Sequence, residues 1–249
     1  MIYATALSSS WAIATHLLKQ LRANNITVPS KAEFDSFMFW AIVTIIVSAR
    51  FGHILFFEPT YYLKHPFEVL MIRNGGLSFH GSVIGLGIYS YFFIRSKKVQ
   101  WLLMADVLSI AGALGVGIGR IANFINQELY GKVTSSNYSV VFATVDKFQR
   151  HPTQIFESFF EGFLNFWTLF LILKFRGIRT FGSGVFVSVF CIIYSSSRFA
   201  IEFLKEVEAY NYFNVVQLTV GQVLSIIMFV FGISIKKMKY LTKKLIQRT

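Results

Sequence analysis

The chain has 249 residues, of which 54% are hydrophobic and only 14% are charged, and its formal net charge is +12. Soluble domains carry about 25% charged residues, so this composition excludes an ordinary soluble enzyme and indicates an integral membrane protein. The excess of Lys and Arg lies in short connections between apolar segments and in the C-terminal tail. Membrane topology and anionic lipid account for such a distribution, and no binding of nucleic acid is expected.

Seven apolar segments are candidates for membrane-spanning helices, because a span needs roughly 20 mostly apolar residues. In chain order they cover residues 2–18, 37–57, 79–95, 101–119, 155–173, 182–200 and 214–235. Lys19 and Arg22 follow the first segment rather than precede it, so we expect no cleavable signal peptide, an outer N-terminus and a cytoplasmic C-terminus. The pattern predicts one all-α, polytopic membrane domain over residues 1–249, with longer outer loops near 58–78 and 120–153.

The third segment opens with a glycine-rich stretch that contains one histidine. Residues 74–85 read NGGLSFHGSVIG, with His80 between Gly75 and Gly81. Glycines allow the backbone to approach a ligand closely, and glycines four residues apart also pack membrane helices. Two interpretations stay open for this stretch, a ligand site and a helix-packing surface with an interfacial histidine.

The fourth segment ends in a cluster of polar residues. Residues 119–131 read GRIANFINQELYG and place Arg120, Asn123 and Glu128 at the end of an apolar run. Charged groups are costly there unless function requires them, and a guanidinium offers a planar fork of donors that matches phosphate oxygens. The alternative is that Arg120 reaches the lipid head groups and pairs with Glu128 for structural reasons.

Two later segments each carry a polar face at helical spacing. The residues of these faces are Gln154, Glu157 and Glu161 on the fifth segment and Tyr194, Arg198 and Glu202 on the sixth. Positions separated by three, four, seven or eight residues lie on one side of a helix. We expect the two faces to converge beside Arg120.

Other features of the chain indicate less about chemistry. The segment 138–148, rich in Val, Phe and Thr, is a candidate for a short pair of strands. The single cysteine, Cys191, lies within an apolar segment and is expected to be an inert packing residue. No pair of histidines and no cluster of cysteines has the spacing of metal ligands, so neither a metal nor another cofactor is expected.

Taken together, four motifs resemble those of the prolipoprotein diacylglyceryl transferase family. They are NGGLSFHGSVIG, GRIANFINQELYG, RHPTQIFESFFEG and YSSSRFAIEF, and they occur in the family's order. The resemblance covers roughly residues 40–235. It implies a seven-helix protein of the bacterial inner membrane that moves the diacylglyceryl group of phosphatidylglycerol to the lipobox cysteine of a preprolipoprotein signal peptide. The products would be a thioether and glycerol 1-phosphate, and the nucleophile would belong to the substrate.

The resemblance also implies roles for individual residues. Arg120 and Arg198 would hold the leaving phosphate with Asn123 as a neutral donor, and His80 would be the base for the thiol or a phosphate ligand. The other residues expected to bind or shape the substrate site are Tyr3, Gly75, Gly81, Glu128, Gly131, His151, Tyr194 and Glu202. Among them, Glu128 and Glu202 would orient the arginines or bind the glycerol part.

The N-terminus departs from the family pattern. Family members usually have an Arg-Trp-Tyr-Gly element near their start, whereas this chain begins Met1-Ile2-Tyr3-Ala4. Tyr3 takes the position of the tyrosine, but the Arg-Trp pair is missing and Ala4 replaces the glycine.

Two other functions agree with the same polar residues. Glycine-interrupted helices with intramembrane Arg and Glu are typical of transporters, and a lipid-binding relative without catalysis would keep the same motifs. Transporters often have repeated halves and polar residues near the middle of the membrane. This chain has no evident repeat, and its polar motifs lie toward the predicted outer side. The transferase is therefore the preferred hypothesis.

Overall fold

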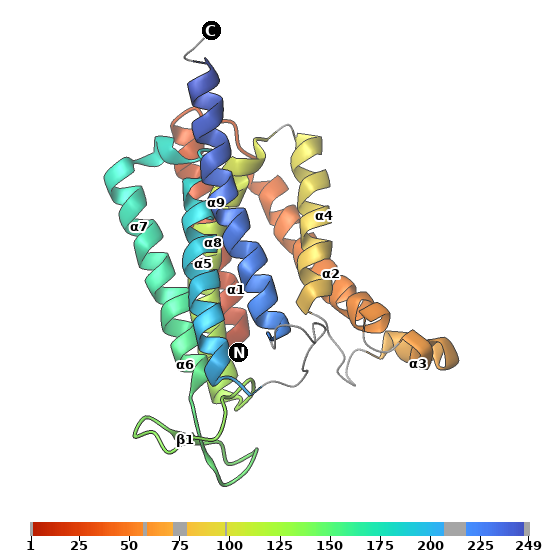
Figure 1. The fold of residues 1–249 in the computed structure, drawn as a ribbon. Coiled ribbons are helices and arrows are strands. Elements are labelled where there is room, and N and C mark those ends of the chain that lie inside the picture. The colour runs from red at the N-terminus through yellow and green to blue at the C-terminus, as the bar shows by residue number, and fades with distance from the viewer. Residues whose placement is uncertain (1, 57–58, 72–78, 98, 207–217, 247–249) are drawn as a thin grey trace. The chain divides into compact units, whose positions relative to one another are not determined.

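The computed structural model describes residues 2–56, 59–71, 79–97, 99–206 and 218–246, and most of them are helical (Figure 1). The helices are α1 (Ile2–Ala23), α2 (Lys31–Phe56), α3 (Pro59–Lys64), η1 (Pro66–Leu70), α4 (Phe79–Lys97), α5 (Trp101–Ile125), α6 (Thr153–Glu157), η3 (Ser158–Phe163), α7 (Leu164–Arg176), η4 (Ile178–Thr180), α8 (Val185–Ile201), η5 (Glu202–Leu204) and α9 (Val220–Ile246). Two short strands, β1 (Val140–Val141) and β2 (Gln149–Arg150), complete the described secondary structure.

Four helical stretches of the described residues are long and apolar enough to cross a membrane. They are Lys31–Leu55, Trp101–Ile125, Thr153–Arg176 and Val185–Leu204, and Gly221–Ile235 is a shorter apolar helix. The chain is therefore an all-helical integral membrane protein. Each of the seven predicted segments lies mostly on a helix; residues 182–184 and 218–219 are described but not helical, and residues 57 and 214–217 lie outside the described part of the chain.

The difference from the predicted boundaries that matters for the polar residues is at the end of α5. Prediction ended this segment at residue 119, whereas α5 continues to Ile125 and so includes Arg120 and Asn123 in its last two turns. The prediction used hydrophobicity alone, and this criterion ends a membrane helix at its first charged residue. Here the charged side chain finds partners within the protein, so the helix continues past it.

The chain divides into two compact units, residues Met1–Asn24 with Leu102–Thr249, and residues Asn25–Trp101. In the second unit α2 packs closely against α4. A Cβ atom at Gly81 would lie 2.2 Å from the Ser48 carbonyl oxygen, and one at Gly85 would lie 2.3 Å from the Ser48 Cβ. The packing interpretation of these glycines is thus confirmed.

In the first unit a buried carboxylate organises the start of α8. Asp106 is fully buried on α5, and its Oδ2 accepts hydrogen bonds from the backbone N–H groups of Gly182 (3.0 Å) and Gly184 (2.9 Å). Its Oδ1 accepts a third bond from Val187 N–H at 3.0 Å. The first N–H groups of a helix have no partner within the helix, so Asp106 satisfies donors that would otherwise be unpaired.

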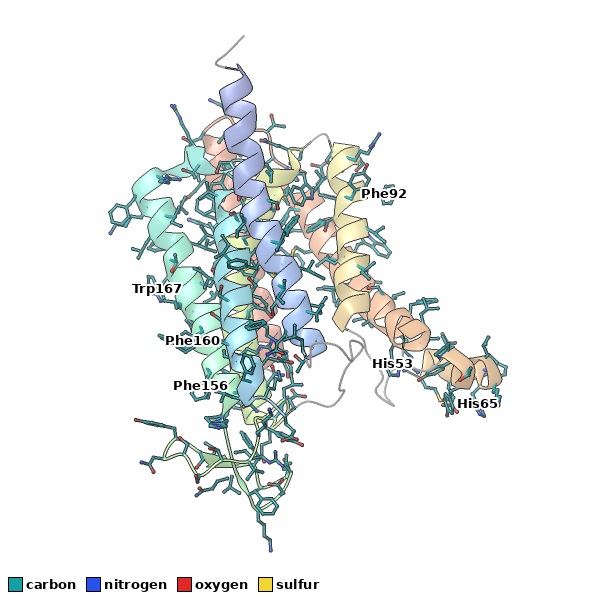
Figure 2. The ribbon with its side chains drawn as sticks, viewed as in Figure 1. His53, His65, Phe92, Phe156, Phe160 and Trp167 are labelled. Atoms are coloured by element: carbon teal, nitrogen blue, oxygen red, sulfur yellow. The ribbon has the colours of Figure 1, made fainter. Side chains whose placement is uncertain are left out.

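The helical stretch from Thr153 to Arg176 contains a π-helical turn, η3, immediately after Glu157. Gly162 of η3 packs against α5, where a Cβ atom would lie 2.2 Å from the Gly117 Cα. The Ser158 hydroxyl donates to the Gly117 carbonyl oxygen at 2.7 Å. The backbones of η3 and α5 are therefore in direct contact where these two helices cross. On the opposite side of the same stretch, Phe160 and Trp167 are exposed and point away from α8, as expected for lipid-facing residues (Figure 2).

We expect Gly162→Ala to destabilise the protein by about 1 to 3 kcal/mol, because its methyl group would collide with backbone rather than with a flexible side chain. Gly112→Ala on α5 is the matched control, since a Cβ atom there meets nothing within 4 Å. Thermal unfolding in detergent, followed by circular dichroism, would compare the two variants. An equal melting temperature for both would contradict this account of the crossing.

A small region of loops and short strands follows α5, at the end of the first unit where α6 begins (Figure 1). Strands β1 and β2 pair antiparallel, with Val140 opposite Arg150. Only the first strand lies within the predicted 138–148 segment. Arg150 holds the region together through an ion pair with Asp146 at 2.6 Å and lies 4.8 Å above the ring of Tyr130. The hydrogen bonds from Arg150 hold the pKa of the Asp146 carboxyl below its usual range.

Candidate active site

Arg120 of α5 reaches two carboxylates that come from the helix with the π-turn. Its Nη1 lies 3.3 Å from Glu157 Oε2, and its Nη2 lies 3.3 Å from Glu161 Oε2. Both carboxylate side chains are fully buried. The predicted alternative, an ion pair between Arg120 and Glu128, is wrong, because the ion-pair partners of Arg120 are Glu157 and Glu161.

Arg198 of α8 contacts the same carboxylates from another side. Its Nη1 forms a close ion pair with Glu157 Oε1 and lies 3.9 Å from Glu161 Oε1. Its Nη2 lies 2.8 Å from Glu202 Oε2, one helical turn further along the chain. The predicted convergence of the two polar faces beside Arg120 is thus confirmed.

Lys205 is a third cation of this cluster, and sequence reasoning missed it. Its Nζ lies 2.8 Å from Glu157 Oε1, and its side chain is 9% exposed. Lys205 follows Glu202 by three residues and so continues the spacing of the polar face on α8. That spacing could have been used to find Lys205 in the sequence.

The cluster balances three cations, Arg120, Arg198 and Lys205, against the carboxylates of Glu157, Glu161 and Glu202. Ionised groups away from water are costly unless they are paired, and here each has an opposite partner. Exposure is unequal within the cluster. Each arginine side chain remains 18% exposed, whereas Glu157 and Glu161 have no exposed surface. An entering anion would therefore meet guanidinium donors and not these two carboxylates.

A second polar cluster joins the start of α1 to the residues after α5. Tyr3 donates a short hydrogen bond to Glu128 Oε1. Asn123 Nδ2 donates to Tyr3 Oη at 2.7 Å and to Glu128 Oε1 at 3.1 Å, and Asn126 Nδ2 donates to the same Oε1 at 3.2 Å. Tyr3 thus occupies a polar site although the residues around it differ from the family pattern. The described side-chain hydrogen bonds of Glu128 are to Tyr3, Asn123 and Asn126, and its predicted part in orienting the arginines or binding the glycerol stays a prediction.

Burial opposes ionisation of Glu128, but the hydrogen bonds from Tyr3, Asn123 and Asn126 prevail and hold its pKa below the usual range. The resulting stabilisation is complete above the unfolded-state pKa and is lost as the pH falls through the lowered pKa. We expect Glu128→Gln to lower both the melting temperature and the turnover, the latter by about tenfold if one charged hydrogen bond is lost.

The difference in melting temperature between wild type and Glu128→Gln should be present at neutral pH and should shrink as the pH falls. Circular dichroism over a pH series in detergent would measure it. A difference that grows toward acid pH would contradict the assignment of Glu128 as the ionised acceptor.

Several backbone contacts connect the two clusters. Gln154 Nε2 donates to the Glu128 carbonyl oxygen at 2.7 Å, so the polar face of α6 is fixed to the chain after α5. Gly131 N–H donates to the His151 carbonyl oxygen at 3.0 Å, and Gly131 forms a β-bridge with Lys205. A Cβ atom at Gly131 would lie 2.6 Å from His151 Cβ and 2.8 Å from the Leu204 carbonyl oxygen. Gly131 is therefore required for a three-segment junction that includes His151, and the binding of substrate by His151 stays a prediction.

Tyr194 lies one turn before Arg198 on α8 and stacks on Phe190 with ring centroids 5.7 Å apart. The remaining predicted site residues belong to the second unit. Gly75 and the side chain of His80 lie outside the described residues, and Gly81 packs against α2. Sequence reasoning placed these three residues in the same site as Arg120, and that part stays a prediction.

The geometry defines a helical integral membrane protein in which two arginines, held by buried carboxylates, present partly exposed donors to an anionic group. The sequence profile described as prolipoprotein diacylglyceryl transferase matches residues 1–237. The chain therefore belongs to the prolipoprotein diacylglyceryl transferase family.

Individual members of the family are similar over most of their length. The chain is 42% identical to the phosphatidylglycerol–prolipoprotein diacylglyceryl transferase of Ehrlichia canis over 205 residues, which is 82% of this chain and 78% of that protein. It is 35% identical to the enzyme of the same name from Rickettsia felis over 233 residues, which is 92% of this chain and 87% of the relative. The corresponding protein of Ehrlichia ruminantium (strain Welgevonden) is 39% identical over 209 residues.

Proposed function

We propose that this chain transfers the diacylglyceryl group of phosphatidylglycerol to the lipobox cysteine of preprolipoproteins. The observation that carries the proposal is the arginine pair, whose guanidiniums keep exposed surface while the carboxylates that hold them are buried. The relatives named for this reaction are similar over most of this chain, which supports the same substrates here.

In this reaction the cysteine sulfur forms a bond to the glyceryl carbon while the bond from that carbon to the phosphate oxygen breaks. The electron pair of the broken bond leaves with glycerol 1-phosphate. Fixed donors in a site of low dielectric constant stabilise such a leaving group strongly. Arg120 and Arg198 take this role, and Asn123, one helical turn from Arg120, adds a neutral donor.

The incoming thiol must lose its proton, because the thiolate is the nucleophile and a free cysteine has a pKa near 8.5. We assign His80 as the base that accepts this proton, with binding of the phosphate as its alternative role. Glu202 orients Arg198, and Gly131 shapes the backbone beside Lys205. Tyr3, Asn123 and Glu128 form the polar wall between the start of α1 and the end of α5.

The predicted topology belongs to the same proposal. All seven apolar segments would cross the bacterial inner membrane as one domain, with the N-terminus and the site on the outer side and the C-terminus in the cytoplasm. The basic residues after the first segment and in the tail support this orientation. The site would then face the compartment in which a lipobox cysteine emerges from the membrane.

A direct test uses the purified protein in detergent with phosphatidylglycerol and a synthetic lipobox peptide. Mass spectrometry should detect a diacylglyceryl thioether on the peptide cysteine and release of glycerol 1-phosphate. A lipid that is retained by well-folded protein without any thioether product would contradict the transferase and favour a lipid-binding protein without catalysis.

A further inference from the structure

Glu157 is a buried carboxylate in the middle of the arginine cluster, and the proposed reaction does not use it. A carboxylate that touched the substrate would repel the anionic phosphate. Instead its side chain is fully buried and contacts Arg120, Arg198 and Lys205. We infer that Glu157 is a positioning residue, which holds the two guanidiniums at the separation that the leaving phosphate requires; this inference rests on the proposed function.

The two carboxylate oxygens of Glu157 contact cations from different helices. Oε2 faces Arg120 of α5 at 3.3 Å, while Oε1 faces Arg198 of α8 and Lys205. Two guanidiniums that converge on one phosphate repel each other in the absence of an anion. A carboxylate between them removes this repulsion and sets their geometry before the substrate arrives, which is the preorganisation that electrostatic catalysis needs.

Glu157 is itself held in place from both sides along the chain. Gln154 and Thr153 donate to the carbonyl oxygens of Glu128 (2.7 Å) and Leu129 (3.2 Å). Ser158 donates to the Gly117 carbonyl oxygen at 2.7 Å, and the π-turn begins at this residue. The carboxylate therefore stands on a short, rigid segment between fixed contacts.

Glu161 provides a matched comparison on the same helix. Its side chain is as buried as that of Glu157, but it lies 3.3 Å from Arg120 and 3.9 Å from Arg198, and in the described part of the chain it forms no ion pair with Lys205. Glutamine is nearly isosteric with glutamate, so Glu157→Gln and Glu161→Gln remove one charge each from equally buried positions. A difference in kcat between the two variants would therefore reflect the position of the carboxylate and not its burial.

The experiment measures kcat and KM for phosphatidylglycerol in the peptide transfer assay. Glu157→Gln should lower kcat by about 100-fold, the loss typical of a catalytic group misplaced by about an ångström. Its KM should not rise, because the cluster becomes more positive toward an anionic lipid. Glu161→Gln should lose only about tenfold in kcat, since its contacts are fewer and longer.

A double variant separates positioning from charge balance. Glu157→Gln with Lys205→Met restores the balance of charges but not the bridge between the arginines, so kcat should stay low. If Glu157→Gln fails to fold, Glu157→Asp keeps the charge but withdraws it by one methylene, and its kcat should fall more than that of Glu161→Asp.

Recovery of kcat in the double variant, equal losses in Glu157→Gln and Glu161→Gln, or a loss confined to KM would each overturn the inference while leaving the proposed function intact. Transfer by the wild type is the reference for every variant. A folded wild-type protein that catalyses no transfer would contradict both the proposed function and this inference.

Discussion

Arg120→Ala is expected to reduce transfer by at least about 1,000-fold, because it removes a charged donor from the leaving phosphate in a site of low dielectric constant. It also leaves Glu157 and Glu161 with one cation fewer, which disturbs the position of Arg198. The peptide transfer assay would measure the loss, with the melting temperature of each variant recorded alongside.

Two control variants make the result interpretable. Arg120→Lys keeps the charge but not the planar fork, so it should recover only a small part of the rate. Arg179→Ala removes an exposed arginine of η4 in the same unit and should leave transfer unchanged. Turnover near that of the wild type in Arg120→Ala would exclude Arg120 as the phosphate ligand.

The largest effect on stability is expected at Asp106. In Asp106→Asn one oxygen acceptor becomes an NH₂ donor that faces backbone N–H groups, either those of Gly182 and Gly184 or that of Val187. Buried donors without acceptors are costly, and we expect a loss of about 3 to 5 kcal/mol. For a chain of this size the melting temperature would fall on the order of 10 °C.

Exposure of the buried Cys191 thiol to a fluorogenic maleimide would report this unfolding in detergent. Ser109→Ala is the matched control, because the buried Ser109 hydroxyl donates only to the Ala105 carbonyl within its own helix, at 2.7 Å. A melting temperature for Asp106→Asn within a few degrees of that control would show that the start of α8 does not depend on the carboxylate.

Helical spacing was enough to predict the centre of the site. Glu157 and Glu161 on one face, and Arg198 and Glu202 on another, were expected to converge beside Arg120, and the ion pairs confirm this. Charged groups within membrane helices have few choices of partner, so a residue pattern specifies their contacts more strongly than it does at a protein surface.

Other parts of the site could not be predicted in this way. The partner of Glu128 depends on how the chain turns after Ile125, and no periodicity describes a turn. The π-turn at Ser158–Phe163 arises from a backbone crossing with Gly117, which only the packed structure reveals. Tyr3 was assigned through the family resemblance alone; its hydroxyl hydrogen-bonds with Glu128 and Asn123, and its role toward the substrate stays a prediction.

The position of Cys191 determines whether the protein could attach lipid to its own thiol. An enzyme that attaches lipid to thiols would be inactivated if one of its own thiols met the activated lipid. The only cysteine of the chain is 5% exposed, packs against Val187 and Ile235, and lies two helical turns from Arg198, about 10 Å along the helix axis. We therefore expect no self-lipidation of Cys191, and a thioether formed in the assay should be on the peptide.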